Sequence, residues 1–137
     1  MPGGREMTEE NKRVADVMAQ HPAKIRLGTE VSEVAEVLLR LRMTGLPVVD
    51  ADMKVVGFVS EQDCLRSLLV SSYHDEGRPR VDDIMNPDPY TVQADASVVD
   101  IANLMLMQKP KIYPVVDQDM QLVGLIHRGQ VLAALKR

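Results

Sequence analysis

The sequence predicts an α/β (α+β) protein with two pseudo-twofold-related halves, each a small three-stranded sheet packed with helices. Two observations lead to this fold class. A shift of 67 residues aligns residues 14–70 with residues 81–137 without a gap, and 17 of the 57 aligned positions are identical. Both segments also carry the same order of apolar patterns, which predicts short helix, strand, amphipathic helix, β-hairpin and closing helix.

The identical positions mark corresponding places in the two halves. Most of them fall at the start of each half and in the hairpin: Val14-Ala-Asp-Val-Met18 aligns with Val81-Asp-Asp-Ile-Met85, Pro47-Val-Val-Asp50 with Pro114-Val-Val-Asp117, and Val56-Gly57 with Val123-Gly124. Chance similarity would scatter and need gaps, so the chain is an internal duplication.

Each element follows from local patterning. The Asp-x-Met groups, Asp16-Val-Met18 and Asp83-Ile-Met85, predict a short helical turn at the start of each half. Extended stretches follow at residues 23–27 and 90–93. Apolar residues at helical spacing predict helices from residue 31 to 41 and from 98 to 106, the second opened by a Ser97–Asp100 capping box. Hairpins are expected with strands 46–49 and 55–59, and 112–116 and 122–126. Pro47 and Pro114 are expected near a strand start, where a missing N–H is tolerated.

These elements divide the chain into four parts. Residues 1–11 form a tail, 12–70 the first domain, 71–80 a polar linker and 81–137 the second domain. A sheet of three strands leaves one face uncovered, so the two halves are expected to close against each other.

Composition narrows the function classes. The 137 residues are 45% hydrophobic and only 3% aromatic, and the net charge is −4. An acidic chain without a basic stripe argues against nucleic acid as a partner. No apolar run approaches the length of a membrane-spanning helix, and no signal peptide opens the chain, so a cytoplasmic location is expected. The single Cys64 excludes an internal disulfide and a Cys-based metal cluster.

The order and duplication of these motifs resemble the CBS domain, a family named for cystathionine β-synthase. The resemblance covers residues 14–137 and makes the chain similar to a tandem CBS pair, or Bateman module. It implies a regulatory role: such pairs hold AMP, ADP, ATP or S-adenosylmethionine as regulatory ligands in clefts between the domains. They usually control an attached enzyme, channel or transporter. No such domain is attached here, so we expect a stand-alone module whose regulated protein is unidentified.

The family's ligand motif matches the first repeat at Gly57-Phe-Val-Ser-Glu-Gln-Asp63. Ser60 lies at a strand-to-helix junction, where unpaired backbone N–H groups and the helix dipole favour a phosphate. Asp63 offers two acceptor oxygens to the hydroxyls of a ribose. The same two residues also form the pattern of a helix N-cap, and both interpretations hold for the empty protein.

The second repeat departs from the motif. Its equivalent, Gly124-Leu-Ile-His-Arg-Gly-Gln130, has His127 for the hydroxyl and Gln130 for the carboxylate. A neutral amide forms a weaker ribose bond than a carboxylate, so we expect one good site and one degraded site. His127 and Arg128 either contact a ligand phosphate or form a solvated helix start.

The resemblance also implies adenine contacts on the first strand and before the Pro-Val-Val-Asp strand. In the first repeat these positions are Lys24, Ile25, Leu46 and Pro47, and in the second they are Thr91, Val92, Tyr113 and Pro114. Tyr113 either stacks on a base or packs at the edge of the sheet.

The function expected from the sequence is a ligand-sensing, homodimeric CBS pair that signals by conformational change. The alternative is a ligand-free scaffold for protein interaction or dimerisation. No nucleophile–base pair, metal cluster, Walker loop or dinucleotide glycine motif is present, so no enzymatic activity, catalytic residue or metal is expected.

Overall fold

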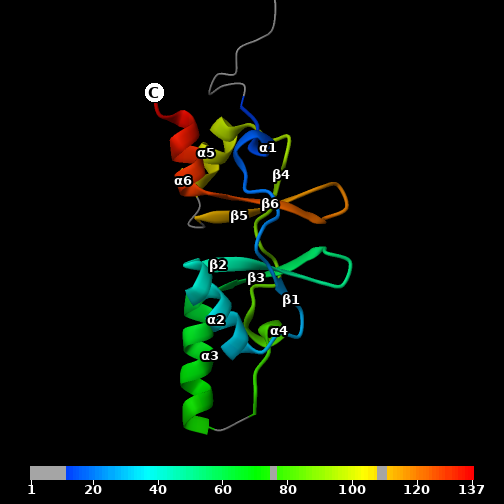
Figure 1. Cartoon of the computed structure of the whole chain (residues 1–137), viewed down its shortest axis with the longest axis vertical. Coiled ribbons are helices and arrows are strands. Elements are labelled where there is room, and N and C mark those ends of the chain that lie inside the picture. Colours follow the sequence, from blue (N-terminus) through cyan, green and yellow to red (C-terminus); the bar gives the residue numbers. More distant parts are fainter. Residues whose placement is uncertain (1–11, 75–76, 108–110) are drawn as a thin grey trace, which may run out of the picture. The chain divides into compact units, whose positions relative to one another are not determined.

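The structure, a computed structural model, describes residues 12–74, 77–107 and 111–137 (Figure 1). The tail predicted at residues 1–11 lies outside them. The sheets have the strand orders β1-β2-β3 and β4-β5-β6, which confirms the predicted fold class. In chain order the elements are α1 (Val14–Val17), β1 (Ile25–Arg26), α2 (Val31–Leu41), β2 (Gly45–Val49), β3 (Val55–Ser60), α3 (Glu61–His74), α4 (Val81–Ile84), β4 (Val92–Gln93), α5 (Val98–Met107), β5 (Ile112–Val116), β6 (Leu122–His127) and α6 (Arg128–Leu135).

The chain divides into two compact units whose limits differ from those of the sequence repeats. Unit 2 holds residues 23–90 and 119–122, and unit 1 holds the rest of the described chain. Each unit therefore joins the sheet and long helices of one repeat to the short opening helix of the other, α4 in unit 2 and α1 in unit 1. The predicted domain limits, 12–70 and 81–137, describe the sequence repeats and not these compact units, and they stay a prediction.

The sheet of unit 2 contains the predicted hairpin. β1 runs parallel to β2, and β2 pairs with β3 in antiparallel register, Leu46 opposite Val59. Asp50 organises the turn, because its Oδ1 accepts the N–H groups of Asp52 at 2.9 Å and Lys54 at 3.0 Å. Met53 closes the turn with a φ of 65°, the left-handed residue of a bulged hairpin loop.

Pro47 does not lie where the sequence predicted. It is the third of five residues of the central strand β2, opposite Phe58. Phe58 directs both its backbone N–H and its C=O to Asn86, at 3.0 and 2.8 Å. Pro47 therefore occupies a position that exchanges no hydrogen bond with β3, and β1 pairs only from Val48 onward. A central-strand proline is tolerated here because neither neighbour requires its missing N–H.

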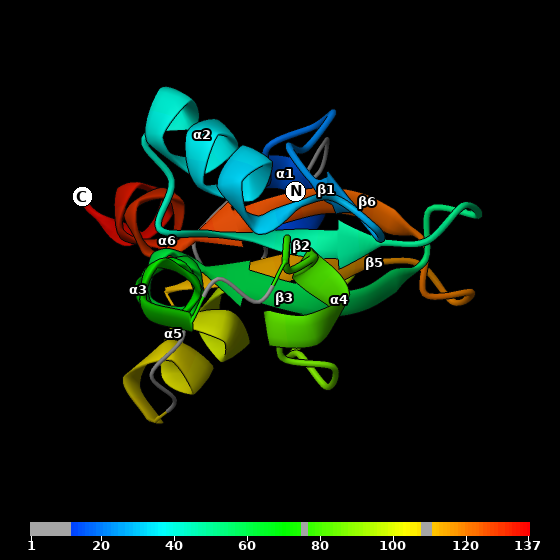
Figure 2. The same ribbon diagram turned by 90° about the horizontal axis from the view of Figure 1, so that it is seen from below.

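Two long helices of unit 2 pack against each other beside the sheet (Figures 1 and 2). α2 buries Val31, Val34 and Leu38, as its apolar spacing predicted. α3 continues to His74, so the first four residues of the predicted linker are helical. No proline or glycine interrupts the helical sequence before Gly77, which explains the extra turn.

Unit 1 repeats this arrangement with β4, β5, β6, α5 and α6. Ser97 caps α5, since its Oγ accepts the Val99 N–H at 3.2 Å. The apolar core joins the sheet and long helices of this unit to α1, and its buried members are Val14, Val92, Val98, Ile101, Tyr113, Val115, Ile126, Val131 and Ala134.

The methionine of each Asp-x-Met group packs on the hairpin of the other repeat. In unit 2 a Cβ added to Gly57 would lie 2.4 Å from Sδ of Met85 and 3.1 Å from the backbone oxygen of Asn86. In unit 1 the corresponding distances from Gly124, to Met18 Sδ and the Ala19 oxygen, are also 2.4 and 3.1 Å. The duplicated glycines are therefore needed for this close approach, a packing role that the sequence analysis did not assign.

Candidate functional site

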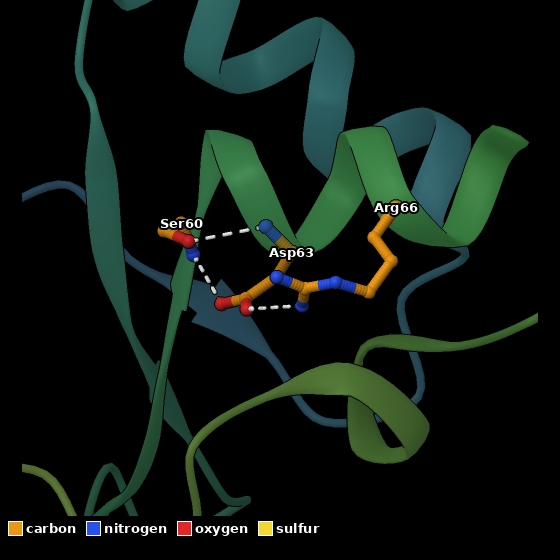
Figure 3. Close-up of polar contacts among 3 residues, drawn as sticks. All are labelled: Ser60, Asp63 and Arg66. Atoms are coloured by element: carbon orange, nitrogen blue, oxygen red, sulfur yellow. Dashed lines mark hydrogen bonds and ion pairs between the residues drawn. The ribbon is translucent and has the colours of Figure 1, made fainter.

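Ser60 and Asp63 lie at the junction of β3 and α3 (Figure 3). The Ser60 N–H donates to Oδ2 of Asp63 at 2.9 Å, and the Asp63 N–H donates to Oγ of Ser60 at 3.1 Å. This reciprocal pair is a capping box, the N-cap arrangement that the sequence left open beside ligand binding.

Three backbone N–H groups at this junction, those of Ser60, Glu61 and Asp63, already have acceptors. Besides the two bonds within the capping box, the Glu61 N–H donates to the carbonyl oxygen of Thr44 at 2.9 Å. The expectation of unpaired N–H groups ready for a phosphate is therefore wrong for Ser60, Glu61 and Asp63. A phosphate here would have to replace bonds that already stabilise the start of α3.

Asp63 also lines a cleft of about 420 Å³ within unit 2. Its side chain is 25% exposed, so one face of the carboxylate remains accessible. The walls come from α3, the segment before α4 and α4 itself, and they are formed by Asp63, Arg66, Ser67, Val70, Ser71, Pro79, Asp83 and Ile84. The cleft thus combines residues of both repeats, as the family resemblance implied.

The cleft carries two carboxylates and one guanidinium. Arg66, one turn after Asp63, places Nη1 3.7 Å from Oδ1 of Asp63 (Figure 3). The Arg66 side chain is 68% exposed, so this ion pair is weak and easily rearranged. Asp83 on the opposite wall accepts the Arg80 N–H at 3.1 Å. Charged and hydroxyl groups beside Val70, Pro79 and Ile84 give the cleft both hydrogen-bonding groups and apolar surface for a small molecule.

Cys64 follows Asp63 and is buried, with 3% of its surface exposed. Burial raises the pKa of the Cys64 thiol, and the nearby carboxylates of Asp63 and Glu61 raise it further. The thiol is therefore held in its neutral form and serves as an apolar helix residue.

The adenine-binding residues predicted in the first repeat all lie in unit 2 but outside the residues that line this cleft. Ile25, Leu46 and Pro47 are buried strand residues, so their side chains serve the core. Lys24, which precedes β1, is half-buried. Any contribution of the strand residues to a ligand comes from their backbone.

The second predicted set lies in unit 1. Tyr113 is fully buried in the core, so the packing interpretation holds and no ring face is presented to a base. Val92 and Pro114 are also buried, and Thr91 is half-buried.

His127 and Arg128 are exposed at the start of α6. The His127 N–H donates to Oε1 of Gln130 at 2.8 Å, and Nδ1 of His127 accepts the Gln130 N–H at 3.4 Å. The second repeat thus keeps the capping box of the first with different side chains. The Arg128 N–H donates to the Lys111 carbonyl at 2.9 Å, as Glu61 does to Thr44.

Sequence reasoning missed Arg66, Ser67, Asp83 and Ile84 as cleft residues. Asp83 and Ile84 belong to the duplicated Asp-x-Met group, so the repeat itself carried a signal for them. Arg66 and Ser67 have no counterpart of the same type in the second repeat, where Ala133 and Ala134 occupy the positions.

Within the described residues, no group of His, Cys, Asp and Glu is placed to hold a metal ion. In the same part of the chain, no helix has the length and apolar character needed to cross a bilayer.

Residues 14–70 and 81–137 each match the CBS domain family, so the chain belongs to this family and contains two CBS domains in tandem. The chain is 35% identical over 134 residues to the chloroplastic CBS domain-containing protein CBSX1 of Arabidopsis thaliana. That match covers 77% of this chain and 56% of CBSX1, so the chain spans little more than half of that relative.

Solved structures support the same assignment. The crystal structure of CBSX2 in complex with AMP matches with a TM-score of 0.78 and 34% identity, covering 89% of this chain and 94% of the other. CBSX2 comes from A. thaliana. A further relative is a homoserine O-acetyltransferase of Methanohalobium evestigatum, 28% identical, where the match covers 82% of this chain but only 22% of the enzyme.

Proposed function

We propose that this CBS pair binds an adenosine nucleotide or S-adenosylmethionine in the Asp63 cleft as a regulatory signal and has no catalytic activity. The observation that carries the proposal is the position of the Asp63 carboxylate, which is part of a capping box and also lines a cleft of about 420 Å³. The 34% identical CBSX2, crystallised with AMP, supports this ligand class.

The carboxylate has acceptor capacity left for a ribose. Oδ2 of Asp63 accepts the Ser60 N–H, and Oδ1 lies 3.7 Å from Nη1 of the exposed Arg66. A carboxylate oxygen has two lone pairs, so Asp63 can accept bonds from ribose hydroxyls without releasing Ser60. Displacement of Arg66 frees its guanidinium for an acidic group of the ligand.

Calorimetry with AMP, ADP, ATP and S-adenosylmethionine tests the proposal, with Asp63→Gln as the decisive variant. Glutamine at this position keeps the capping box, as Gln130 shows at the equivalent helix start with a 2.8 Å bond. It removes the negative charge that strengthens a ribose bond. Loss of one charge-assisted hydrogen bond, about 1.5–3 kcal/mol, weakens binding roughly 10- to 150-fold.

A matched control separates binding from folding. Gln130→Ala removes the same capping bond in the second repeat without touching the Asp63 cleft, so it should leave the dissociation constant unchanged. Equal affinity of wild type and Asp63→Gln for every ligand would place the ligand elsewhere. Absence of binding to wild type would refute the adenosine proposal and favour the ligand-free scaffold.

The signalling step is proposed as a population shift. The cleft joins α3 of the first repeat to α4 of the second, so a ligand that contacts both favours one arrangement of these segments. The shift is limited by the difference in ligand affinity between the arrangements. Hydrogen exchange with and without AMP tests it: protection should rise in residues 77–84 and in the first turn of α3, and unchanged exchange would refute the step.

Exposed leucines favour a homodimer, the second part of the proposal. Leu65 and Leu69 lie four residues apart on α3 and are 68% and 56% exposed, and Leu39 on the neighbouring α2 is 71% exposed. Large exposed apolar side chains on two helices that pack against each other suit a protein interface. Light scattering should show a dimer that Leu65→Glu converts to a monomer; a wild-type monomer would contradict this assembly.

The cytoplasmic location and an unidentified regulated protein remain proposals. CBSX1 is named as a chloroplastic protein, so an organelle is the alternative location that the test has to distinguish. Fractionation of cells that express the tagged full-length protein tests the location, and enrichment in a membrane or organelle fraction would contradict it.

A further inference from the structure

The two repeats place different residues at one equivalent position of their clefts. In unit 2 the carbonyl oxygen of Pro79 accepts the Val31 N–H at 3.0 Å, and in unit 1 the carbonyl oxygen of Lys12 accepts the Val98 N–H at 3.0 Å. Val31 and Val98 are equivalent under the 67-residue shift, so Lys12 is the structural counterpart of Pro79. Pro79 lines the open Asp63 cleft.

Lys12 spans the equivalent cleft of unit 1. Its Nζ donates to the backbone oxygen of Ala134 on α6 at 3.2 Å, and the contact is partly buried. Ala134 is the counterpart of Ser67, which lines the opposite wall of the cleft in unit 2. The two walls that stay apart in unit 2 are therefore joined in unit 1 by one side chain, which we term the Lys12 strap.

The position of the Lys12 ammonium near the end of α6 is favoured by hydrogen bonding and by the helix dipole. The carbonyl groups in the last turn of a helix lack intrahelical donors and form the negative end of the helix dipole. The Lys12 ammonium satisfies one of these carbonyls near the end of α6. Its backbone is fixed at the same time by the bond to Val98, so the side chain starts from a defined place.

We propose that the Lys12 strap closes the second cleft, so that each chain takes up adenosine ligand only on the Asp63 side. This rests on the proposed function and goes beyond it, because the loss of the second site is assigned to a contact across the cleft in addition to the missing carboxylate. If Lys12 closes the cleft, the substitution Gln130→Asp alone does not restore a ligand site in unit 1.

The contact itself is tested without any nucleotide. Acetylation of the intact, folded protein by an amine-reactive ester, followed residue by residue with mass spectrometry, compares Lys12 with the exposed Lys136 at the end of α6. One hydrogen bond slows the reaction of Lys12 about fivefold or more. Equal rates for the two amines in the folded protein, with equal rates also in urea, would overturn the strap.

A transplanted carboxylate tests the consequence. The variant Asp63→Gln/Gln130→Asp moves the carboxylate to the second cleft, and calorimetry with AMP should detect no more binding than for Asp63→Gln alone. Addition of Lys12→Met, which keeps the apolar stem and removes the ammonium, should restore binding at one site per chain. Lys136→Met in the same background is the matched control and should restore nothing.

The outcomes separate the two proposals. Tighter binding of AMP by the exchanged variant with Lys12 intact than by Asp63→Gln alone, or no gain upon Lys12→Met, would overturn the strap as the barrier. Failure of wild type to bind any of the four adenosine ligands would instead refute the proposed function, and the acetylation rates would still decide whether Lys12 is held across the cleft.

Discussion

Replacement of Gly57 by alanine tests the packing between the two repeats. The new Cβ would lie 2.4 Å from Sδ and 3.0 Å from Cγ of Met85, and 3.1 Å from the backbone oxygen of Asn86. The Met85 side chain can rotate away, but the Asn86 oxygen is held by the Phe58 N–H at 3.0 Å. We expect Gly57→Ala to lower the free energy of unfolding by about 1–3 kcal/mol, the usual cost of overpacking.

Urea unfolding followed by circular dichroism measures this cost. The second repeat supplies a matched variant, Gly124→Ala, because its added Cβ meets Met18 at the same 2.4 and 3.0 Å. In a double-mutant cycle with Met85→Ala, we expect a coupling energy of about 1 kcal/mol between the two substitutions, because shortening Met85 relieves part of the clash with the new Cβ. A change below about 0.5 kcal/mol in both glycine variants, or a zero coupling energy, would refute the packing argument.

Three further results are expected. Met120 is 40% exposed and its φ of 64° lies in the left-handed region, which is strained for methionine and favourable for asparagine. Met120→Asn should therefore raise the free energy of unfolding by about 0.5–1 kcal/mol in urea titrations, and a decrease would contradict the backbone strain at this position. Gln130→Ala removes the acceptor of the His127 N–H and should cost about 1 kcal/mol, and an unchanged midpoint would show that this cap contributes nothing. Burial, together with the carboxylates of Asp63 and Glu61, raises the pKa of the Cys64 thiol, so the folded state keeps this proton at higher pH than the unfolded state. The free energy of unfolding should therefore fall as the pH rises past the ordinary pKa of a cysteine thiol, and Cys64→Ala should flatten that fall; parallel pH profiles would contradict it.

The sequence predicted the fold well because the duplication repeats every local signal. The order of elements, the amphipathic helix α2 and the hairpin turn at Asp50 follow from residue spacing and turn chemistry. The exchange of α1 and α4 between the compact units was not predictable in this way. It depends on which surface Met18 and Met85 reach, and patterns within one repeat carry no information about contacts with the other.

The site was predicted in part. The Ser60–Asp63 pattern indicated the position, but it could not separate a cap from a ligand contact, because both require the same acceptor atoms at the same helix start. Tyr113 was ambiguous for a similar reason, since an aromatic residue in a strand suits either a core or a binding surface. Lys12 had no motif, and only the structure places its ammonium on Ala134.

A crystal structure of the protein grown with AMP would show whether Asp63 holds the ligand. We expect one nucleotide per chain in unit 2, with a ribose hydroxyl within hydrogen-bond distance of the Asp63 carboxylate and the Ser60 capping bond intact. AMP bound away from Asp63, or held in unit 1 beside an unbroken Lys12–Ala134 contact, would contradict it.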